Sequence, residues 1–335
     1  MSRIVSIAGD GQMALVLAGV CSEAGHQTRL WPPLGDAGGR LSRTRRSARM
    51  PAFELPSGVK VIEDAAEAFG GVDAALVVIP TEFLRATCQR LRGAIGEEAL
   101  VCSFTKGIEV GSLEFPSRII GHELRSGRHR DCVSLSGPNI AAEMVRGAPT
   151  AMVSACPDVS RAEQARQLLV LPRLKIYTTT DVLGLELVGA AKNVVALAAG
   201  MLDGLEAGVN AKSVLLARGL AEIVRLGLAL GASMETFFGV AGVGDLATTC
   251  FSPEGRNRRC GEAIARGASL SDYCAASPCV IEGVQTTRAL AALAARSAVE
   301  MPIAAAVHAV LFEGLQPAEA LASLMARESR QEQRG

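Results

Sequence analysis

Short apolar and β-branched runs alternate with helical patterns through the first half of the chain. The runs have the length of buried strands, and the helical segments repeat apolar residues every three or four positions. The predicted strands are Ile4–Ala8, Thr28–Trp31, Val59–Ile62, Ala74–Ile79, Ala99–Ser103, Val133–Ser136, Thr150–Ser154 and Arg173–Thr178. The predicted helices are Met13–Ala24, Ala65–Phe69, Thr81–Leu91 and Ala141–Arg146, with one more after residue 159. This alternation predicts an α/β, doubly wound domain with a mainly parallel sheet.

The pattern changes near residue 180. From Asp181 onward, alanine, leucine and glycine dominate and the β-branched runs disappear. We therefore expect an α/β domain over residues 1–180 and an all-helical domain over residues 181–335. The segment Pro32–Pro56 has no clear periodicity, and we predict a long loop there with one short helix.

Two later stretches, Val182–Leu202 and Ser213–Ala232, are apolar enough to suggest membrane spans. Both carry charged residues near their middle, so we expect buried helices and no integral membrane segment.

The 34 basic and 34 acidic residues cancel, which argues against a nucleic-acid partner. The nine cysteines include no C-x-x-C pair, so we predict no metal site, reduced thiols and a cytoplasmic protein.

A glycine-rich turn follows the first predicted strand. Gly9, Gly11 and Ala14 form a G-x-G-x-x-A pattern that opens a helix, as in dinucleotide-binding domains. The alternative interpretation is an ordinary glycine turn. The acidic residue that usually forms hydrogen bonds with the ribose of NAD is missing after Trp31, which is followed by two prolines. Four arginines in the following segment would suit the 2′-phosphate of NADPH, which favours NADPH slightly over NADH, unless they form a solvated basic loop: Arg40, Arg43, Arg45 and Arg46.

Polar residues also follow two later predicted strands. Lys106 comes just after Ala99–Ser103, and the segment Ser136–Asn139 (SGPN) ends another strand. Carboxyl ends of parallel strands face the ligand crevice, so we expect both near a cofactor or an anionic substrate. An exposed loop lysine and a plain strand-to-helix turn are the alternatives.

Lys192 is a candidate general acid–base. It lies with Glu186 and Asn193 inside a helix that is apolar nearly all round, and a buried lysine requires a partner or a lowered pKa. Asp245, in a glycine-rich apolar stretch, is the candidate partner. A structural ion pair is the alternative. Arg256 and Asn257 would suit a phosphate, and Glu282 opens another helix, where an acid is also favoured by the helix dipole.

Several segments together resemble the bacterial NAD(P)-dependent glycerol-3-phosphate dehydrogenase family. They occur in family order: IxGxGxxA, VVIPTEFLR, SFTKGIE, SGPNIAAEM, GLELVGAAKNVVALAAGMLDGLEAGVNAK, ARGLAEIVRLG, GVAGVGDLATTC, GRNRRCGEAI and VIEGVQTT. The resemblance implies a dinucleotide-binding domain followed by a helical domain of the 6-phosphogluconate-dehydrogenase-like type, with the active site between them. It also implies reduction of dihydroxyacetone phosphate to sn-glycerol 3-phosphate for glycerophospholipid synthesis.

The resemblance assigns roles to individual residues. Lys192 becomes the catalytic acid–base, and Lys106 touches both substrate and cofactor. In the mechanism that we expect, Asp245 and Asn193 orient or tune Lys192. The implied substrate-binding residues are Lys106, Gly137, Asn139, Asp245, Gly255, Arg256 and Asn257. The implied cofactor-binding residues are Gly9, Gly11, Gln12, Met13, Lys106, Ala141, Arg256, Val280 and Glu282.

The chain departs from the family pattern at several positions. Gln12 and Met13 replace a hydroxyl residue and an aromatic one, Pro32-Pro33 replace an arginine, Asn139 replaces a serine or threonine, and Gly255 replaces a serine. Two other functions stay open on the sequence: a related dehydrogenase for a non-phosphorylated hydroxy acid, and a nucleotide-binding sensor without catalysis. The apolar stretches Ala289–Arg296 and Ile303–Phe312 are compatible with a homodimer.

Overall fold

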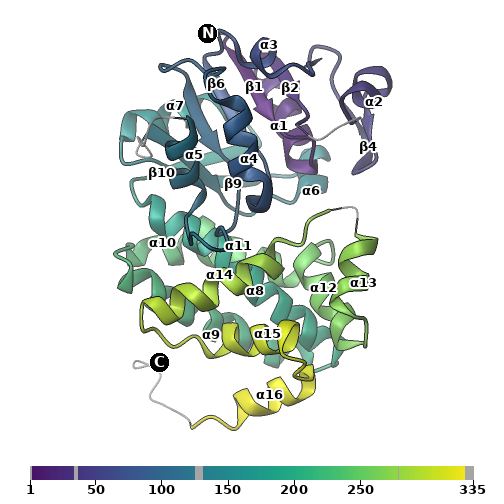
Figure 1. Ribbon diagram of the computed structural model, residues 1–335, viewed down its shortest axis with the longest axis vertical. Helices are drawn as coiled ribbons and strands as arrows, with labels where there is room; N and C mark the ends of the chain where they lie inside the picture. The colour runs from purple at the N-terminus through teal and green to yellow at the C-terminus, as the bar shows by residue number, and fades with distance from the viewer. Residues whose placement is uncertain (1, 34–36, 125–130, 278, 329–335) are drawn as a thin grey trace. The chain divides into compact units, whose positions relative to one another are not determined.

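The computed structural model describes residues 2–33, 37–124, 131–277 and 279–328. The chain divides into two compact units, each described here by itself (Figure 1). The first unit comprises Met1–Lys106 and Pro116–Val182, and the second comprises Gly107–Phe115 and Leu183–Gly335.

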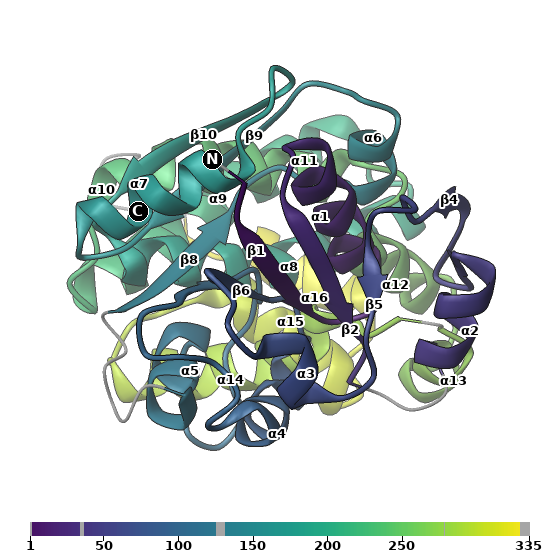
Figure 2. The same cartoon turned by 90° about the horizontal axis from the view of Figure 1, so that it is seen from above.

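An eight-stranded sheet forms the centre of the first unit, and Figure 2 shows its strands in succession. The strands are β1 (Ile4–Ala8), β2 (Gln27–Trp31), β5 (Lys60–Val61), β6 (Ala74–Val77), β7 (Leu100–Ser103), β8 (Cys132–Ser136), β9 (Thr150–Ala155) and β10 (Leu174–Thr179). Their spatial order is β10-β9-β8-β7-β6-β1-β2-β5, and every pair is parallel except β8 with β9. The chain order reverses at β1, so the loops after β1 and β6 lie where such sheets bind ligands.

Helices cover both faces of this sheet, because its strands are apolar on both sides. They are α1 (Gln12–Glu23), α3 (Ala65–Phe69), α4 (Thr81–Leu91), α5 (Pro116–Leu124), α6 (Ala141–Val145) and α7 (Val159–Leu169). One core lies under α1 and α7 and includes Ile7 and Leu76, while the other lies under α3, α4 and α5 and includes Trp31 and Val77. The predicted α/β, doubly wound fold is confirmed, although α5 was not expected from the sequence.

The prediction of a long loop with one short helix over Pro32–Pro56 was wrong in part. The segment contains the helix α2 (Ala37–Thr44) and an antiparallel hairpin of β3 (Arg46–Ser47) and β4 (Met50–Glu54). Arg45 holds the hairpin in place, because its guanidinium donates to the carbonyl oxygens of Leu55, Pro56 and Val59. Because these hydrogen bonds stabilise the hairpin without a periodic pattern of apolar residues, the sequence pattern did not indicate it.

The second unit is helical. Its elements are α8 (Val182–Gly204), α9 (Gly208–Ala229), α10 (Met234–Phe238), the π-type turn η2 (Val240–Gly244), α11 (Asp245–Phe251), α12 (Arg256–Ala265), α13 (Leu270–Ala276), α14 (Glu282–Arg296), α15 (Pro302–Phe312) and α16 (Pro317–Met325). α8 is long and apolar enough to cross a membrane, which no other helix in the described residues is, but 89% of its most apolar window is buried. It is therefore the central core helix of this unit.

The apolar residues of α14 and α15 also point into the core of the second unit. Leu290, Leu293 and Val307 are almost completely buried there. The apolar character of Ala289–Arg296 and Ile303–Phe312 is thus explained within one chain, and it gives no argument for a homodimer.

The buried carboxyl group of Glu222, on α9, should make the stability of the protein depend on pH. Its carboxylate accepts hydrogen bonds from the backbone N–H groups of Ile303 and Ala304 at 2.8 and 3.3 Å, at the start of α15. Burial raises the pKa of Glu222 to about 7. Because the pKa of Glu222 in the folded protein lies above its ordinary value, folding favours the protonated carboxyl. Its contribution to the free energy of unfolding is therefore present at pH 4.5 and is lost as the pH rises through 7. We expect the free energy of unfolding to fall by up to about 3 kcal/mol over this pH range.

Urea unfolding of the wild type and Glu222→Gln between pH 4.5 and 8 checks this expectation. The variant should lack this part of the pH dependence, because the amide does not titrate. An identical pH dependence in both proteins would contradict the assignment to Glu222.

Candidate active site

The glycine turn after β1 has the geometry of a dinucleotide-binding turn. Gly9 has φ +140°, and a Cβ added there would lie 2.6 Å from the carbonyl oxygen of Val78. Gly11 caps α1, and a Cβ added there would meet no atom within 4 Å. The first turn of α1 holds no acidic residue, so its free N–H groups favour an anion. The turn therefore fits the pyrophosphate of a dinucleotide, with open space at Gly11.

The two glycines predict different outcomes when each is replaced by alanine. Gly9→Ala is expected to destabilise the fold by about 1–3 kcal/mol, because the methyl group clashes with β6's following loop and the backbone is left-handed. Gly11→Ala should change stability by less than about 1 kcal/mol. It should still weaken NADH binding by about 10-fold or more, because its methyl group fills the space above the turn.

Thermal unfolding together with a fluorescence titration of NADH separates the two effects. Normal NADH affinity in Gly11→Ala would contradict the placement of the pyrophosphate at this turn.

The loop around the turn is tied to the hairpin of β3 and β4. Asp10, which is 8% exposed, forms an ion pair with Arg49. The side-chain amide of Gln12 donates to the carbonyl oxygen of Arg49 at 2.8 Å. Met13 is half-buried and packs on the core under α1. Asp10 and Arg49 were not among the predicted site residues, since their pairing joins segments 39 positions apart.

The four arginines considered for a 2′-phosphate have different surroundings. Arg45 is occupied by the three carbonyl oxygens that stabilise the hairpin. Arg46 donates to Glu54 at 2.7 Å across the hairpin. Arg40 and Arg43 are exposed on α2. Arg45 is therefore structural, and Arg46 has an anionic partner of its own.

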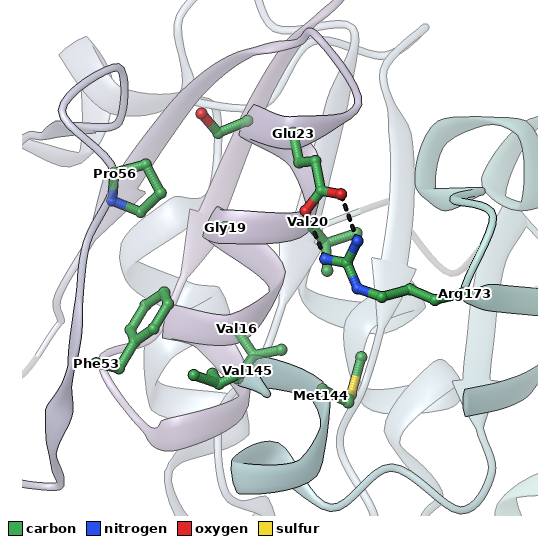
Figure 3. Close-up of a pocket in the computed structure, with 10 residues that line it drawn as sticks. Val16, Gly19, Val20, Glu23, Phe53, Pro56, Met144, Val145 and Arg173 are labelled. Atoms are coloured by element: carbon green, nitrogen blue, oxygen red, sulfur yellow. Dashed lines mark hydrogen bonds and ion pairs between the residues drawn. The ribbon is translucent and has the colours of Figure 1, made fainter. Parts of the chain in front are cut away.

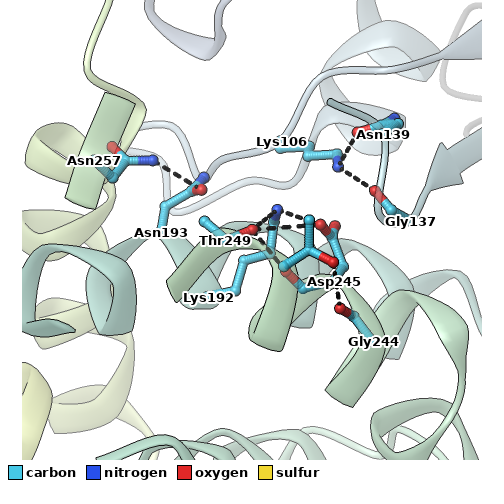
Figure 4. Close-up of polar contacts among 10 residues, drawn as sticks. Lys106, Gly137, Asn139, Lys192, Asn193, Gly244, Asp245, Thr249 and Asn257 are labelled. Carbon is cyan, nitrogen blue, oxygen red and sulfur yellow. Dashed lines mark hydrogen bonds and ion pairs between the residues drawn. The ribbon is translucent and has the colours of Figure 1, made fainter. Parts of the chain in front are cut away.

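Lys106, Gly137 and Asn139 lie together within the first unit (Figure 4). The Lys106 ammonium donates to the carbonyl oxygen of Gly137 and to Oδ1 of Asn139, both at 3.0 Å. Gly137 has φ +151°, and an added Cβ would lie 2.8 Å from the carbonyl oxygen of Ala151, so the loop after β8 requires glycine. Half-buried Ala141 follows at the start of α6. The structure thus brings the ends of β7 and β8 together; that they bind a cofactor or an anionic substrate stays a prediction.

Lys192 lies at the middle of α8 with two polar partners (Figure 4). Its Nζ donates to Oδ1 of Asp245 at 2.6 Å and to the hydroxyl of Thr249 at 2.7 Å. Lys192 and Asp245 are only 5% and 2% exposed. A carboxylate this close to a buried ammonium stabilises both charges, since neither is well hydrated. The arrangement presents a charged, oriented proton donor.

Local structure explains how Asp245 and Thr249 reach the same ammonium. Asp245 begins α11, directly after the π-type turn η2, and its carboxylate is favoured by the helix dipole there. Thr249 lies four residues later, on the same helix face. The Thr249 hydroxyl donates to the backbone oxygen of Asp245 at 2.6 Å, which aims its lone pairs at Lys192. Thr249 was missed, although its spacing from Asp245 in GDLATT was a usable signal.

Asn193 and Asn257 form a second buried contact. Asn257 donates to the amide oxygen of Asn193 at 2.9 Å, and its own Oδ1 accepts the backbone N–H of Gly283 at 2.9 Å. Asn257 thus joins α12 to α8 and α14. The amide of Asn193, expected to orient Lys192, is directed to Asn257 instead (Figure 4).

Arg256 is exposed at the start of α12. Its guanidinium donates to the carbonyl oxygen of Val280 at 3.2 Å, close in sequence to Glu282, the first residue of α14. Gly255 caps α12, and an added Cβ would lie 3.1 Å from the carbonyl oxygen of Thr249. Gly255, Arg256 and Val280, three of the predicted site residues, therefore lie close together. A serine at position 255 would fit only tightly.

A separate hollow on the outer side of α1 contains none of the predicted site residues. Figure 3 shows its apolar walls, which include Val16, Phe53 and Met144. Its edge carries a double ion pair between Glu23 and Arg173. The Arg173 side chain lowers the pKa of Glu23. These contacts fasten the end of α1 to the residue before β10, and we assign the hollow no chemistry.

Comparison with known proteins agrees with this geometry. Models of the NAD-dependent glycerol-3-phosphate dehydrogenase N-terminus and C-terminus match residues 4–162 and 181–322. Glycerol-3-phosphate dehydrogenase [NAD(P)+] of Pelotomaculum thermopropionicum is 40% identical over 93% of this chain and 90% of its own, and that of Dechloromonas aromatica is 42% identical over 92% of each.

A solved structure is also similar. The crystal structure of glycerol-3-phosphate dehydrogenase from Coxiella burnetii superposes with a TM-score of 0.92 at 32% identity, and the match covers 97% of this chain and 99% of that one. Together with the buried Lys192–Asp245 pair and the glycine turn, these matches establish that the chain belongs to the NAD-dependent glycerol-3-phosphate dehydrogenase family.

Proposed function

We propose that this protein catalyses the reversible, NAD(P)H-dependent reduction of dihydroxyacetone phosphate to sn-glycerol 3-phosphate, the precursor of glycerophospholipids. The observation that carries the proposal is the Lys192 ammonium, held inside the apolar core helix by Asp245 and Thr249. A buried, paired ammonium at the middle of an apolar helix supports a role in proton transfer, because buried ionisable groups with a charged partner cluster at functional sites.

The nicotinamide cofactor supplies the hydride when it is bound. The proposed dinucleotide-binding domain, residues 1–180, would hold it at Gly9, Gly11, Gln12 and Met13. Amides at the start of α1 would face the pyrophosphate, and the missing side chain at Gly11 would leave room for it. Lys106 and Ala141, at the ends of β7 and β8, line the same carboxyl edge of the sheet.

The proton step is assigned to the proposed catalytic domain, residues 181–335. Lys192 donates a hydrogen bond to the substrate carbonyl oxygen and gives it a proton as negative charge develops there. Asp245 keeps the amine protonated, and Thr249 fixes its direction. In the reverse direction, the neutral amine accepts the hydroxyl proton.

The phosphate is assigned to the start of α12. Arg256 supplies charge, and the N–H groups beside Gly255 add donors and a favourable dipole. Asn257 acts here by holding α12 in position, since its amide bonds to Asn193 and Gly283. Lys106 and Asn139 are proposed to contact the substrate, and Val280 and Glu282 the cofactor. Binding energy from the phosphate then positions the carbonyl carbon.

We also propose a cytoplasmic location, supported by nine cysteines without a disulfide. A homodimer stays a prediction that size-exclusion chromatography with light scattering can test.

Initial rates with dihydroxyacetone phosphate and either NADH or NADPH test the function. We expect turnover with at least one cofactor, measured as the loss of the absorbance of the reduced nicotinamide. Turnover restricted to a non-phosphorylated hydroxy or keto acid would replace the proposal with a related dehydrogenase. Cofactor binding without turnover of any of these substrates would replace it with a nucleotide sensor.

A further inference from the structure

A short turn, residues 252–255, joins α11 to α12 and directly precedes Arg256. The carbonyl oxygen of Ser252 accepts the backbone N–H of Gly255 at 3.2 Å, which closes the turn. The same carbonyl oxygen accepts a second hydrogen bond, from Nε of Arg258 at 3.0 Å. Because the N–H groups beside Gly255 are proposed to bind the substrate phosphate, the contacts that hold this turn also place the anion.

Two carboxylates orient the guanidinium of Arg258. Its Nη1 donates to Asp203, near the end of α8, and its Nη2 lies 3.2 Å from Oε2 of Glu262, one turn later in α12. The guanidinium is planar, so these two contacts direct the remaining Nε at the carbonyl oxygen of Ser252. The Arg258 side chain is only 13% exposed, and water therefore competes little for these bonds.

The backbone of Arg258 is fixed as well, because α12 lies directly on α8. A Cβ added to Gly200, on α8, would lie 1.8 Å from the carbonyl oxygen of Arg258. Lys192 belongs to the same helix α8. The contacts from Asp203 through Arg258 to Ser252 therefore connect the helix of the proposed proton donor with the turn that precedes the proposed phosphate site.

We propose that Arg258, oriented by Asp203, is a positioning residue for the phosphate of the substrate. It holds the turn 252–255 so that Arg256 and the N–H groups at the start of α12 face the anion. The inference deepens the proposed function and rests on its assignment of the phosphate to α12.

Arg258→Lys tests the contact with Ser252 separately from the ion pair. A lysine can still pair with Asp203, but a single ammonium does not hold the Ser252 carbonyl at the same time. We expect KM for dihydroxyacetone phosphate to rise about 10-fold, since a displaced anion site misplaces the substrate. The fall in kcat should be smaller, less than about 3-fold, because Thr249 keeps its own hydrogen bond to Asp245. Calorimetric titration of the full-length protein with inorganic phosphate should show the same loss of affinity as KM, without turnover.

Lys212→Ala is the matched control. Lys212 forms an ion pair with the other carboxylate oxygen of Asp203, and its side chain is 12% exposed, close to the 13% of Arg258. Its loss should lower the temperature of thermal unfolding and leave KM and phosphate affinity at their wild-type values. Asp203→Asn is a second test variant, which keeps the shape of the carboxyl group but weakens the orientation of Arg258, so KM should rise several-fold.

A role in stability alone predicts that KM follows the unfolding temperature in all these variants. The proposal is overturned by a wild-type KM and phosphate affinity in Arg258→Lys, by equal losses in Lys212→Ala, or by a wild-type protein that does not bind inorganic phosphate. If Arg258→Lys weakens phosphate binding but the wild type does not reduce dihydroxyacetone phosphate, the inference stands and the proposed function fails. Full turnover with unchanged phosphate affinity in Arg258→Lys gives the reverse.

Discussion

Replacing Lys192 by alanine is expected to lower kcat for dihydroxyacetone phosphate by roughly 10²- to 10⁴-fold, the usual contribution of a general acid. Cofactor affinity should change little, because the residues proposed to hold the dinucleotide belong mainly to the first unit. Steady-state kinetics with saturating cofactor provide the measurement. The expected loss lies in kcat, since Lys192 is proposed to act on the charge that develops during hydride transfer.

Lys212→Ala is the matched control for this variant. Lys212 also lies in the second unit, is mostly buried, and forms an ion pair with Asp203, but it has no proposed part in the reaction. Its loss should affect stability and leave kcat near the wild-type value. If Lys192→Ala retained nearly normal turnover, its role as proton donor would be excluded, and the Lys192–Asp245 pair would be a structural ion pair.

Asp245→Asn is expected to have the second-largest effect. It removes the carboxylate that lies 2.6 Å from a 5% exposed ammonium, and an uncompensated buried charge costs about 3–5 kcal/mol. The protein should escape part of this cost by releasing the proton from Lys192. We therefore expect kcat/KM for the reduction to fall about 10²-fold near neutral pH. The decline of activity toward high pH should also begin at a lower pH than in the wild type.

The pH profile of kcat/KM and thermal unfolding separate this effect from simple destabilisation. Thr249→Val should produce a smaller change of the same kind, because it removes a neutral partner, and Thr249→Ser should restore the wild-type profile. A pH profile for Asp245→Asn that is lower but not displaced would show that Asp245 supports the fold without tuning the proton donor.

Much of the fold could be predicted from the sequence because its signals are local. Buried parallel strands need continuous apolar runs, and core helices need apolar residues all round, so both patterns are visible without coordinates. Lys192 was identifiable for the same reason, as a charge inside the apolar helix α8. The G-x-G-x-x-A turn directly after β1 likewise carries its backbone requirements in its own residues.

The tertiary structure decided which side chains meet. Thr249 joins Lys192 and Asp245, Asn193 turns to Asn257, and Arg45 supports a hairpin where only loop and helix were predicted. Arg49 reaches Asp10 across 39 positions. Periodicity reports how one segment exposes its faces to solvent. It carries no information about the partner that a polar side chain finds on another segment, because that partner is fixed only when the packed core sets the distance between them.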